Sequence, residues 1–338
     1  MPCSTMSGYW GTFERAPIRR RMLAPARRTP IRHDGPVPGV ETVEFASQGA
    51  VLRGRLYHRA APRPRACVVM AHGTSATIGM VTDRYAEALH DAGLAVLLYD
   101  HHGFGASGGE PRLEINPWIQ ARGYRDALTH LSGHPGIDPS RIALWGDSYS
   151  AGHVLIVGAV DPRPAAIVVQ VPALGPAPPP PDPAGELFAA LAATLESGDV
   201  RGTPGTTTGP LPVVSPDQLG TPSLLTPLSA FRWFNEYGGR HGSGWENRVT
   251  RTIPPTPAPY HAGLATPHLR TPLLALIAPE DEMPGAAPAV ARAAVDAAPA
   301  EVEILEIEGG HFGLLWYPGA LFDRAVAAQR DFLLRVLA

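Results

Sequence analysis

The chain has 338 residues, of which 44% are hydrophobic, enough for one large domain with a substantial buried core. Its formal net charge of −3 at pH 7 provides no electrostatic basis for binding nucleic acid or an acidic membrane surface. Two cysteines cannot build a disulfide framework, and no apolar run reaches the roughly 20 residues that a membrane helix requires, so we expect a cytoplasmic protein.

The N-terminal part divides into two segments. Residues 1–38 are rich in Arg and Pro and show no periodicity, which predicts a disordered basic leader. Residues 41–59 alternate polar and apolar side chains on both sides of Gln48-Gly49, which predicts a β-hairpin.

Strand and helix patterns then alternate along the chain. Continuous apolar runs predict strands that are covered on both faces, over residues 66–73, 94–100, 141–148, 165–172, 271–281 and 301–311. Helical spacing is found over residues 83–93, 117–134, 151–159 and 320–337. This alternation predicts an α/β fold with a mostly parallel, doubly wound sheet.

The alternation stops after the fourth of these strands. Residues 173–262 show no strand pattern and contain a Pro-rich linker, a predicted helix over 184–198 and an aromatic segment over 228–239. A segment of this length between two sheet strands should fold over one end of the sheet. We therefore expect a mainly helical cap at 173–262, inserted into a core formed by residues 39–172 and 263–338.

Three residue types that can act together in catalysis follow predicted strands. Ser148 follows the third parallel strand, Asp281 the fifth and His311 the sixth, and ligands of open parallel sheets bind at the carboxyl ends of strands. A serine hydroxyl needs a histidine to accept its proton, and the histidine needs a carboxylate to orient it. The sequence therefore predicts a Ser148–His311–Asp281 triad, although Glu280 and Glu282 are close enough to replace the aspartate.

The serine lies in a modified Gly-x-Ser-x-Gly pattern. The stretch GDSYS, residues 146–150, carries Ser150 at the second glycine position, and the next glycine is Gly152. Small residues are needed there because strand and helix approach closely around a strained serine. Ser150 is small, so we interpret the stretch as a nucleophile turn.

Other parts of a site can be predicted around this turn. The backbone N–H groups of Thr74, after the first parallel strand, and Tyr149, after the serine, are expected to bind the oxyanion of a tetrahedral intermediate. Trp233, Trp245 and Tyr260 in the cap are candidate substrate-pocket residues, with packing inside the cap as the alternative.

One glycine motif points to a different function. Residues 103–108, GFGASG, match the dinucleotide-binding pattern G-x-G-x-x-G after a strand, but no helix pattern begins directly after them. No His and Glu cluster has the spacing of a metal site. We therefore expect neither a cofactor nor a metal.

Several motifs resemble the α/β-hydrolase superfamily: VVMAHGTSA, LLYDHHGFGASGG, IALWGDSYSAGH, PLLALIAPEDEMP and IEGGHFG. The resemblance covers residues 40–172 and 265–338. Within the superfamily, the chain is similar to one branch, that of dienelactone-hydrolase-like esterases, X-Pro dipeptidyl-peptidase-like hydrolases and fungal polyketide transferases. This resemblance implies a serine nucleophile at Ser148, the acid at Asp281 and the base at His311, with the backbone of Thr74 and Tyr149 as oxyanion hole.

The expected activity is hydrolysis of an ester, thioester or lactone of a small, largely apolar acyl substrate through an acyl-enzyme, in a secondary-metabolism context that the resemblance suggests. One alternative is an acyltransferase or cyclising enzyme that uses the same serine with an alcohol or amine acceptor. Another is a non-hydrolytic protein that uses the pocket for binding or non-covalent cyclisation. The expected partner is a small molecule, and the expected state is a monomer or homodimer.

Overall fold

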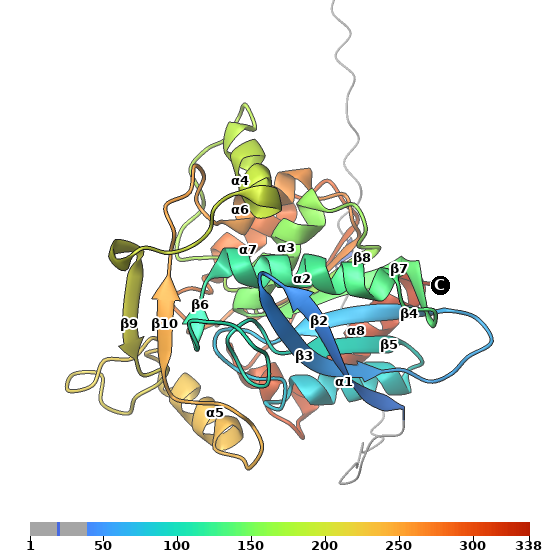
Figure 1. Cartoon of the computed structure of the whole chain (residues 1–338), viewed down its shortest axis with the longest axis horizontal. Coiled ribbons are helices and arrows are strands. Elements are labelled where there is room, and N and C mark those ends of the chain that lie inside the picture. The colour runs from blue at the N-terminus through green and yellow to red at the C-terminus, as the bar shows by residue number, and fades with distance from the viewer. Residues whose placement is uncertain (1–18, 21–38) are drawn as a thin grey trace, which may run out of the picture.

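A central sheet of nine strands organises the computed structural model, which describes residues 19–20 and 39–338 (Figure 1). The strand order is β1-β12-β11-β8-β7-β4-β5-β3-β2, and only the β2–β3 and β3–β5 pairs are antiparallel. The strands are β1 (Arg19–Arg20), β2 (Val40–Ser47), β3 (Ala50–Tyr57), β4 (Arg65–Ala71), β5 (Ala95–Tyr99), β7 (Ile137–Asp147), β8 (Ala166–Gln170), β11 (Leu273–Ile277) and β12 (Val302–Glu306). The predicted α/β fold with a mostly parallel sheet is confirmed.

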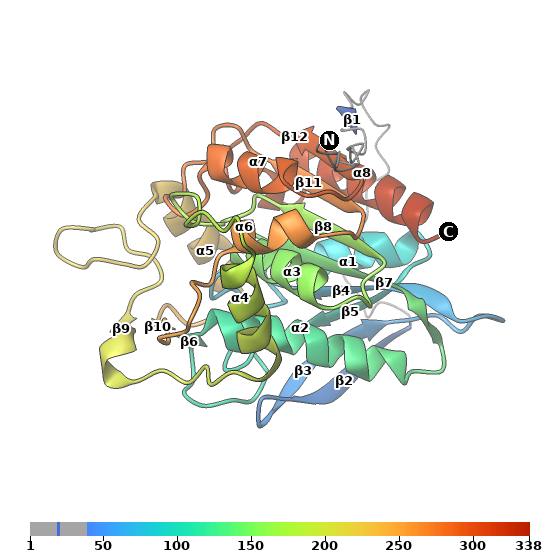
Figure 2. The ribbon, with the colours of Figure 1, turned by 90° about the horizontal axis from the view of Figure 1, so that it is seen from above.

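Helices cover both faces of this sheet (Figure 2). One face carries α1 (Thr82–Asp91) and α8 (Ala320–Val336). The other carries α2 (Pro117–Ser132), α3 (Tyr149–Val160), α6 (Ala262–Ala265) and α7 (Pro288–Asp296). Helix α7 has no counterpart among the predicted elements.

Two hydrophobic cores follow from the alternation of side chains along each strand. On β4, Val68 and Met70 belong to the core beneath α1 and α8, whereas Cys67 and Val69 belong to the core beneath α2 and α3. All four side chains are fully buried. Burial on both faces explains why the parallel strands appear in the sequence as continuous apolar runs.

The N-terminal predictions have two outcomes. The hairpin is confirmed, because β2 and β3 pair from Val40↔Tyr57 to Ser47↔Ala50 around the Gln48-Gly49 turn. The predicted leader at 1–38 lies outside the described residues except for β1, which pairs in parallel with β12.

The segment between β8 and β11 contains more strand than we predicted. It includes helices α4 (Glu186–Ser197) and α5 (Leu228–Gly238), but also strands β9 (Thr207–Leu211) and β10 (Val249–Thr252). These strands form a small sheet with β6 (Glu114–Ile115), in the order β6-β10-β9. The expectation that this segment has no strands was wrong, because β9 is short and largely exposed and carries no apolar pattern.

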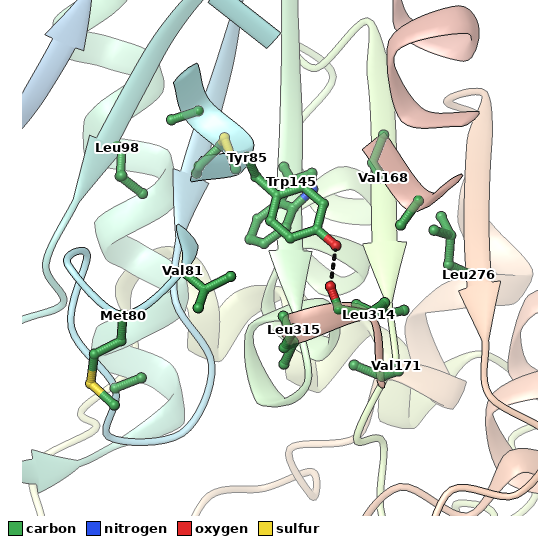
Figure 3. Packing of buried hydrophobic residues seen from close by; sticks show 14 of the residues in the cluster. Met80, Val81, Tyr85, Leu98, Trp145, Val168, Val171, Leu276, Leu314 and Leu315 are labelled. Carbon is green, nitrogen blue, oxygen red and sulfur yellow. Dashed lines mark hydrogen bonds between the residues drawn. The ribbon is translucent and has the colours of Figure 1, made fainter. Parts of the chain in front are cut away.

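Figure 3 shows the core beneath α1 at the point where it supports the C-terminal loop. The Tyr85 hydroxyl of α1 donates a 2.7 Å hydrogen bond to the carbonyl oxygen of Leu314, and its ring lies 5.7 Å from that of Trp145 on β7. Leu314 is three residues beyond His311. The core therefore anchors the loop that carries His311.

Within the described ranges, the helices are all too short or too polar to cross a membrane.

Candidate active site

Ser148 lies at the sharp turn between β7 and α3. Its backbone has φ 50° and ψ −117°, in the positive-φ region that non-glycine residues rarely occupy. Gly146 permits this turn, because a Cβ there would lie 2.6 Å from the carbonyl carbon of Ser150. Gly152 has no such constraint, since a Cβ there would meet only the Leu174 side chain, at an ordinary contact distance of 3.6 Å.

The structure brings Ser148, His311 and Asp281 together in one hydrogen-bonded chain. The Ser148 Oγ lies 3.0 Å from Nε2 of His311, and Nδ1 of His311 lies 2.7 Å from Oδ2 of Asp281. The side chains of His311 and Asp281 are each only 3% exposed. With the proton on Nδ1, the imidazole donates to Asp281 and presents Nε2 as an acceptor to the serine hydroxyl.

The neighbouring acids have separate contacts. Asp281 Oδ1 accepts a 3.0 Å hydrogen bond from the Met283 N–H, which fixes the carboxylate that faces the His311 ring. Glu282 instead accepts a 2.8 Å hydrogen bond from the His311 backbone N–H and a second one from the Ser229 hydroxyl. Of the two, Asp281 therefore contacts the imidazole, and Glu282 holds the backbone that carries it.

Thr74 and Tyr149, the predicted oxyanion donors, line the same cavity as Ser148. Tyr149 is the first residue of α3, so its N–H has no partner within the helix. Gly73 allows the loop of Thr74 to approach the serine, because a Cβ at Gly73 would lie 2.9 Å from the Ser148 Cβ.

Ser150 has a specific role that the modified pattern did not reveal. Its buried hydroxyl donates a 2.5 Å hydrogen bond to the carbonyl oxygen of His72 and lies 2.9 Å from Nε2 of His101. Burial and the neighbouring histidines hold the pKa of His101 well below its usual range, so this ring is neutral. A glycine at this position has no hydroxyl group, so it could not form the hydrogen bond that joins the helix to the loop that precedes Thr74.

Asp147 places a second carboxyl group beside the nucleophile. Its side chain is buried and lines the cavity, and its Oδ1 has no hydrogen-bond partner among the described residues. Burial raises the pKa of Asp147 to about 7, and the electrostatic interaction with His311 and backbone hydrogen bonds only partly oppose this effect. Sequence reasoning missed this residue, although its position before Ser148 is visible in the motif.

A cavity of about 360 Å³ opens above Ser148. Most of its lining is apolar: Ala76, Ile115, Ala173, Pro176, Leu224, Leu225, Trp233, Phe234, Met283, Pro284, Phe312 and Leu315. Apart from the Tyr149 phenol, its acidic and basic lining residues are Asp147, Arg251 and His311. The shape and polarity suit an apolar small molecule.

The three predicted pocket aromatics have different positions. Trp233 lines the cavity and donates a 2.9 Å hydrogen bond from Nε1 to the Leu315 carbonyl oxygen. Trp245 instead packs on Phe234, and the Tyr260 hydroxyl lies 2.5 Å from Nδ1 of His153 behind the serine turn. Neither Trp245 nor Tyr260 is part of the cavity lining.

The glycine motif at 103–108 folds around a carboxylate. Asp100 accepts hydrogen bonds from the backbone N–H groups of Ile78, at 2.9 Å, and Ala106, at 3.0 Å. No helix follows before α2, so the motif lacks the helix N-terminus that binds a dinucleotide pyrophosphate. In the described part of the chain, no group of three or more His, Cys, Asp and Glu side chains is arranged to hold a metal ion.

Three curated proteins illustrate what the chain is similar to. Thiohydrolase apmlB of Arthrinium phaeospermum is 40% identical over 134 residues, 39% of this chain and 43% of the relative. Polyketide transferase af380 of Aspergillus fumigatus is 35% identical over 133 residues, which are 39% of this chain and 45% of the relative. The chain thus spans less than half the length of these fungal relatives. Quorum-quenching protein AidA of Acinetobacter baumannii is 29% identical over 303 residues, 87% of this chain and 94% of the relative.

Family and structural matches agree on the fold. The family model Hydrolase_4, described as serine aminopeptidase S33, matches residues 62–203. The crystal structure of the alpha/beta hydrolase GrgF from Penicillium sp. sh18 aligns with a TM-score of 0.64 at 23% identity, over 88% of this chain and 99% of the other. With its sheet order and the turn at Ser148, the chain has the α/β-hydrolase fold.

Proposed function

We propose that the protein is a serine hydrolase that cleaves an ester or thioester of a largely apolar acyl group. The observation that carries the proposal is the continuous hydrogen-bonded chain from Ser148 Oγ through His311 to Asp281. The names of the relatives, thiohydrolase among them, support the same reaction class.

The reaction would proceed in two halves. Ser148 Oγ forms a bond to the carbonyl carbon while its proton passes to Nε2 of His311. The backbone N–H groups of Thr74 and Tyr149 would bind the resulting oxyanion. The bond from carbon to the leaving sulfur or oxygen then breaks, and His311 returns the proton to the leaving group. In the second half a water molecule repeats these steps on the acyl-enzyme and releases the carboxylic acid.

Acyl transfer is the second candidate, with an alcohol or amine in place of water. Two observations favour it: the mostly apolar cavity, which suits exclusion of water, and the similarity to polyketide transferase af380. Both reactions share the acyl-enzyme, so they differ only in the acceptor.

Covalent labelling tests the shared step. The folded protein is incubated with a fluorophosphonate, and intact mass and peptide mapping locate the adduct. We expect one adduct on Ser148 that is absent in Ser148→Ala and strongly slowed in His311→Ala. Ser140→Ala, which alters an exposed serine at the other end of β7, is the matched control and should label normally.

Product analysis then separates the two reactions. Acyl thioesters and esters are supplied with and without alcohol and amine acceptors, and free acid is measured against transfer product. Free acid as the main product in the presence of acceptor supports hydrolysis, and acceptor-dependent product supports transfer. No adduct and no turnover in folded protein would contradict both and favour a protein that uses the pocket for binding or non-covalent cyclisation.

A further inference from the structure

Arg251 is a charge at the active-site cavity that the proposed reaction does not use. It lies on β10 and is the sole Arg or Lys among the described residues that line the cavity. Its side chain is exposed, which places it where the cavity opens to solvent. Twelve of the other lining residues are apolar, so an uncharged acyl chain would give this guanidinium no partner.

The small cap sheet holds Arg251 in position. Its in-register neighbour on β6 is Ile115, which also lines the cavity. The flanking residues Val249 and Thr252 are fully buried, and Thr250 donates a 2.9 Å backbone hydrogen bond to Leu113. The backbone that carries the charge is therefore fixed, as a binding residue requires.

No carboxylate of the described chain forms an ion pair with Arg251. The acid on the neighbouring strand, Glu114, instead accepts a 2.7 Å hydrogen bond from the Thr252 hydroxyl. Arg248, three residues before Arg251, shows the contrast, since it lies 3.7 Å from a Glu246 carboxylate oxygen. A guanidinium that has no carboxylate partner and lies beside an apolar cavity is available to a ligand anion.

Arg251 also acts on the residue that follows the nucleophile. Burial raises the pKa of Tyr149, and the charge and hydrogen bond of Arg251 lower it. Arg251 and Tyr149 line the same cavity, and Tyr149 is one residue from Ser148. An anion held by Arg251 would belong to a molecule whose carbonyl group can reach the serine.

We propose that Arg251 is a specificity-determining residue that pairs with an anionic oxygen group, a carboxylate or a phosphate, on the acyl substrate. Guanidinium binds both groups through two parallel hydrogen bonds, which adds orientation to attraction. The anion lies either on the acyl chain or on the leaving group. This inference rests on the proposed serine hydrolase, whose substrate class it narrows.

Matched substrates test it. For the acyl chain, the 4-nitrophenyl hemi-ester of glutaric acid is compared with its methyl ester, which lacks the charge. For the leaving group, butyryl-coenzyme A is compared with butyryl-N-acetylcysteamine. We measure kcat and KM for the native protein, Arg251→Gln, Arg251→Lys and the matched control Arg248→Gln, and check folding by thermal unfolding.

The expected result is a loss of roughly tenfold or more in kcat/KM for at least one charged substrate in Arg251→Gln, mainly through KM. The neutral counterpart should change little, Arg251→Lys should recover part of the loss, and Arg248→Gln should behave as the native protein. A loss on the hemi-ester assigns the anion to the acyl chain, and a loss on the coenzyme A ester assigns it to the leaving group. Equal effects on charged and neutral substrates would overturn the proposal.

Failure of the proposed function is distinguishable from failure of this inference. If the native protein cleaves none of the four substrates, the hydrolase proposal fails. Calorimetric binding of glutarate and of coenzyme A to Ser148→Ala, with and without Arg251→Gln, then tests the arginine alone. Weaker binding of either anion in the double variant supports Arg251 as the anion site, and unchanged binding of both, or no binding, overturns it.

Discussion

Replacing Asp147 by asparagine should remove the part of the pH dependence of the free energy of unfolding that this carboxyl group causes. Burial raises the pKa of Asp147 from 3.8 to about 7, and one carboxylate oxygen has no partner among the described residues. Between these values the folded protein holds a proton that the unfolded chain has lost. The stabilisation is therefore complete below pH 3.8 and is lost as the pH rises through 7. Asparagine resembles the protonated acid at every pH.

The magnitude follows from the size of the shift. A rise of about three pH units at 1.36 kcal/mol per unit gives about 4 kcal/mol in total, of which roughly 3 kcal/mol falls between pH 4.5 and 8.5. The free energy of unfolding, measured by urea denaturation across this range, should therefore increasingly favour Asp147→Asn as the pH rises.

A second buried aspartate provides the control. Burial raises the pKa of Asp161, but its hydrogen bonds and charge interactions with Arg163 and Arg125 outweigh this and lower it. Its carboxylate is therefore favoured in the folded state, and the stability that it contributes is lost only as the pH falls below about 4. Between pH 4.5 and 8.5 the difference in the free energy of unfolding between Asp161→Asn and the native protein should therefore stay nearly constant. A difference between Asp147→Asn and the native protein that stays constant with pH would refute the reasoning for Asp147.

Three further substitutions test the supports of the site. Ser150→Gly matches the usual motif but leaves a buried nitrogen of His101 unpaired, so we expect a loss of about 1–3 kcal/mol in urea denaturation; unchanged stability would contradict this. Gly146→Ala would force a Cβ against the backbone of Ser150, so fluorophosphonate labelling should fall at least tenfold, and normal labelling would show that the turn can adjust. Glu282→Gln keeps an acceptor for the His311 N–H but removes the charge, so kcat should fall less than in Glu282→Ala, and equal losses would argue against this hydrogen bond.

The parts of the fold that the sequence predicted are those with a local pattern. The central strands β4, β5, β8 and β11 are buried on both faces, so each appears as an apolar run wherever its neighbours lie in the chain. Strand β9 is different, because it is exposed and gains its partner β10 about forty residues later. No local window of sequence contains that pairing.

The same distinction applies to the site. Ser148, Asp281 and His311 each follow a predicted strand, so the sheet topology predicts that they meet, and the structure brings them within hydrogen-bond distance. Arg251 lies on a strand that was not predicted, so its place in the cavity could not be expected. The hydrogen bond between Ser150 and His101 joins residues 49 positions apart and has no sequence signal.

The hydrogen bond between Trp233 and Leu315 connects the helix that covers the cavity to the loop that positions His311. Trp233 belongs to α5, which covers the cavity, and Leu315 lies four residues after the histidine that faces Ser148. Tyr85 holds the adjacent carbonyl group from the core side. If α5 swings away to admit a substrate, it either breaks the bond to Leu315 or pulls on a segment that Tyr85 keeps in place. The position of helix α5 and the position of His311 are thus coupled through this hydrogen bond. The contact between His311 and Ser148 is therefore best supported when α5 covers the cavity.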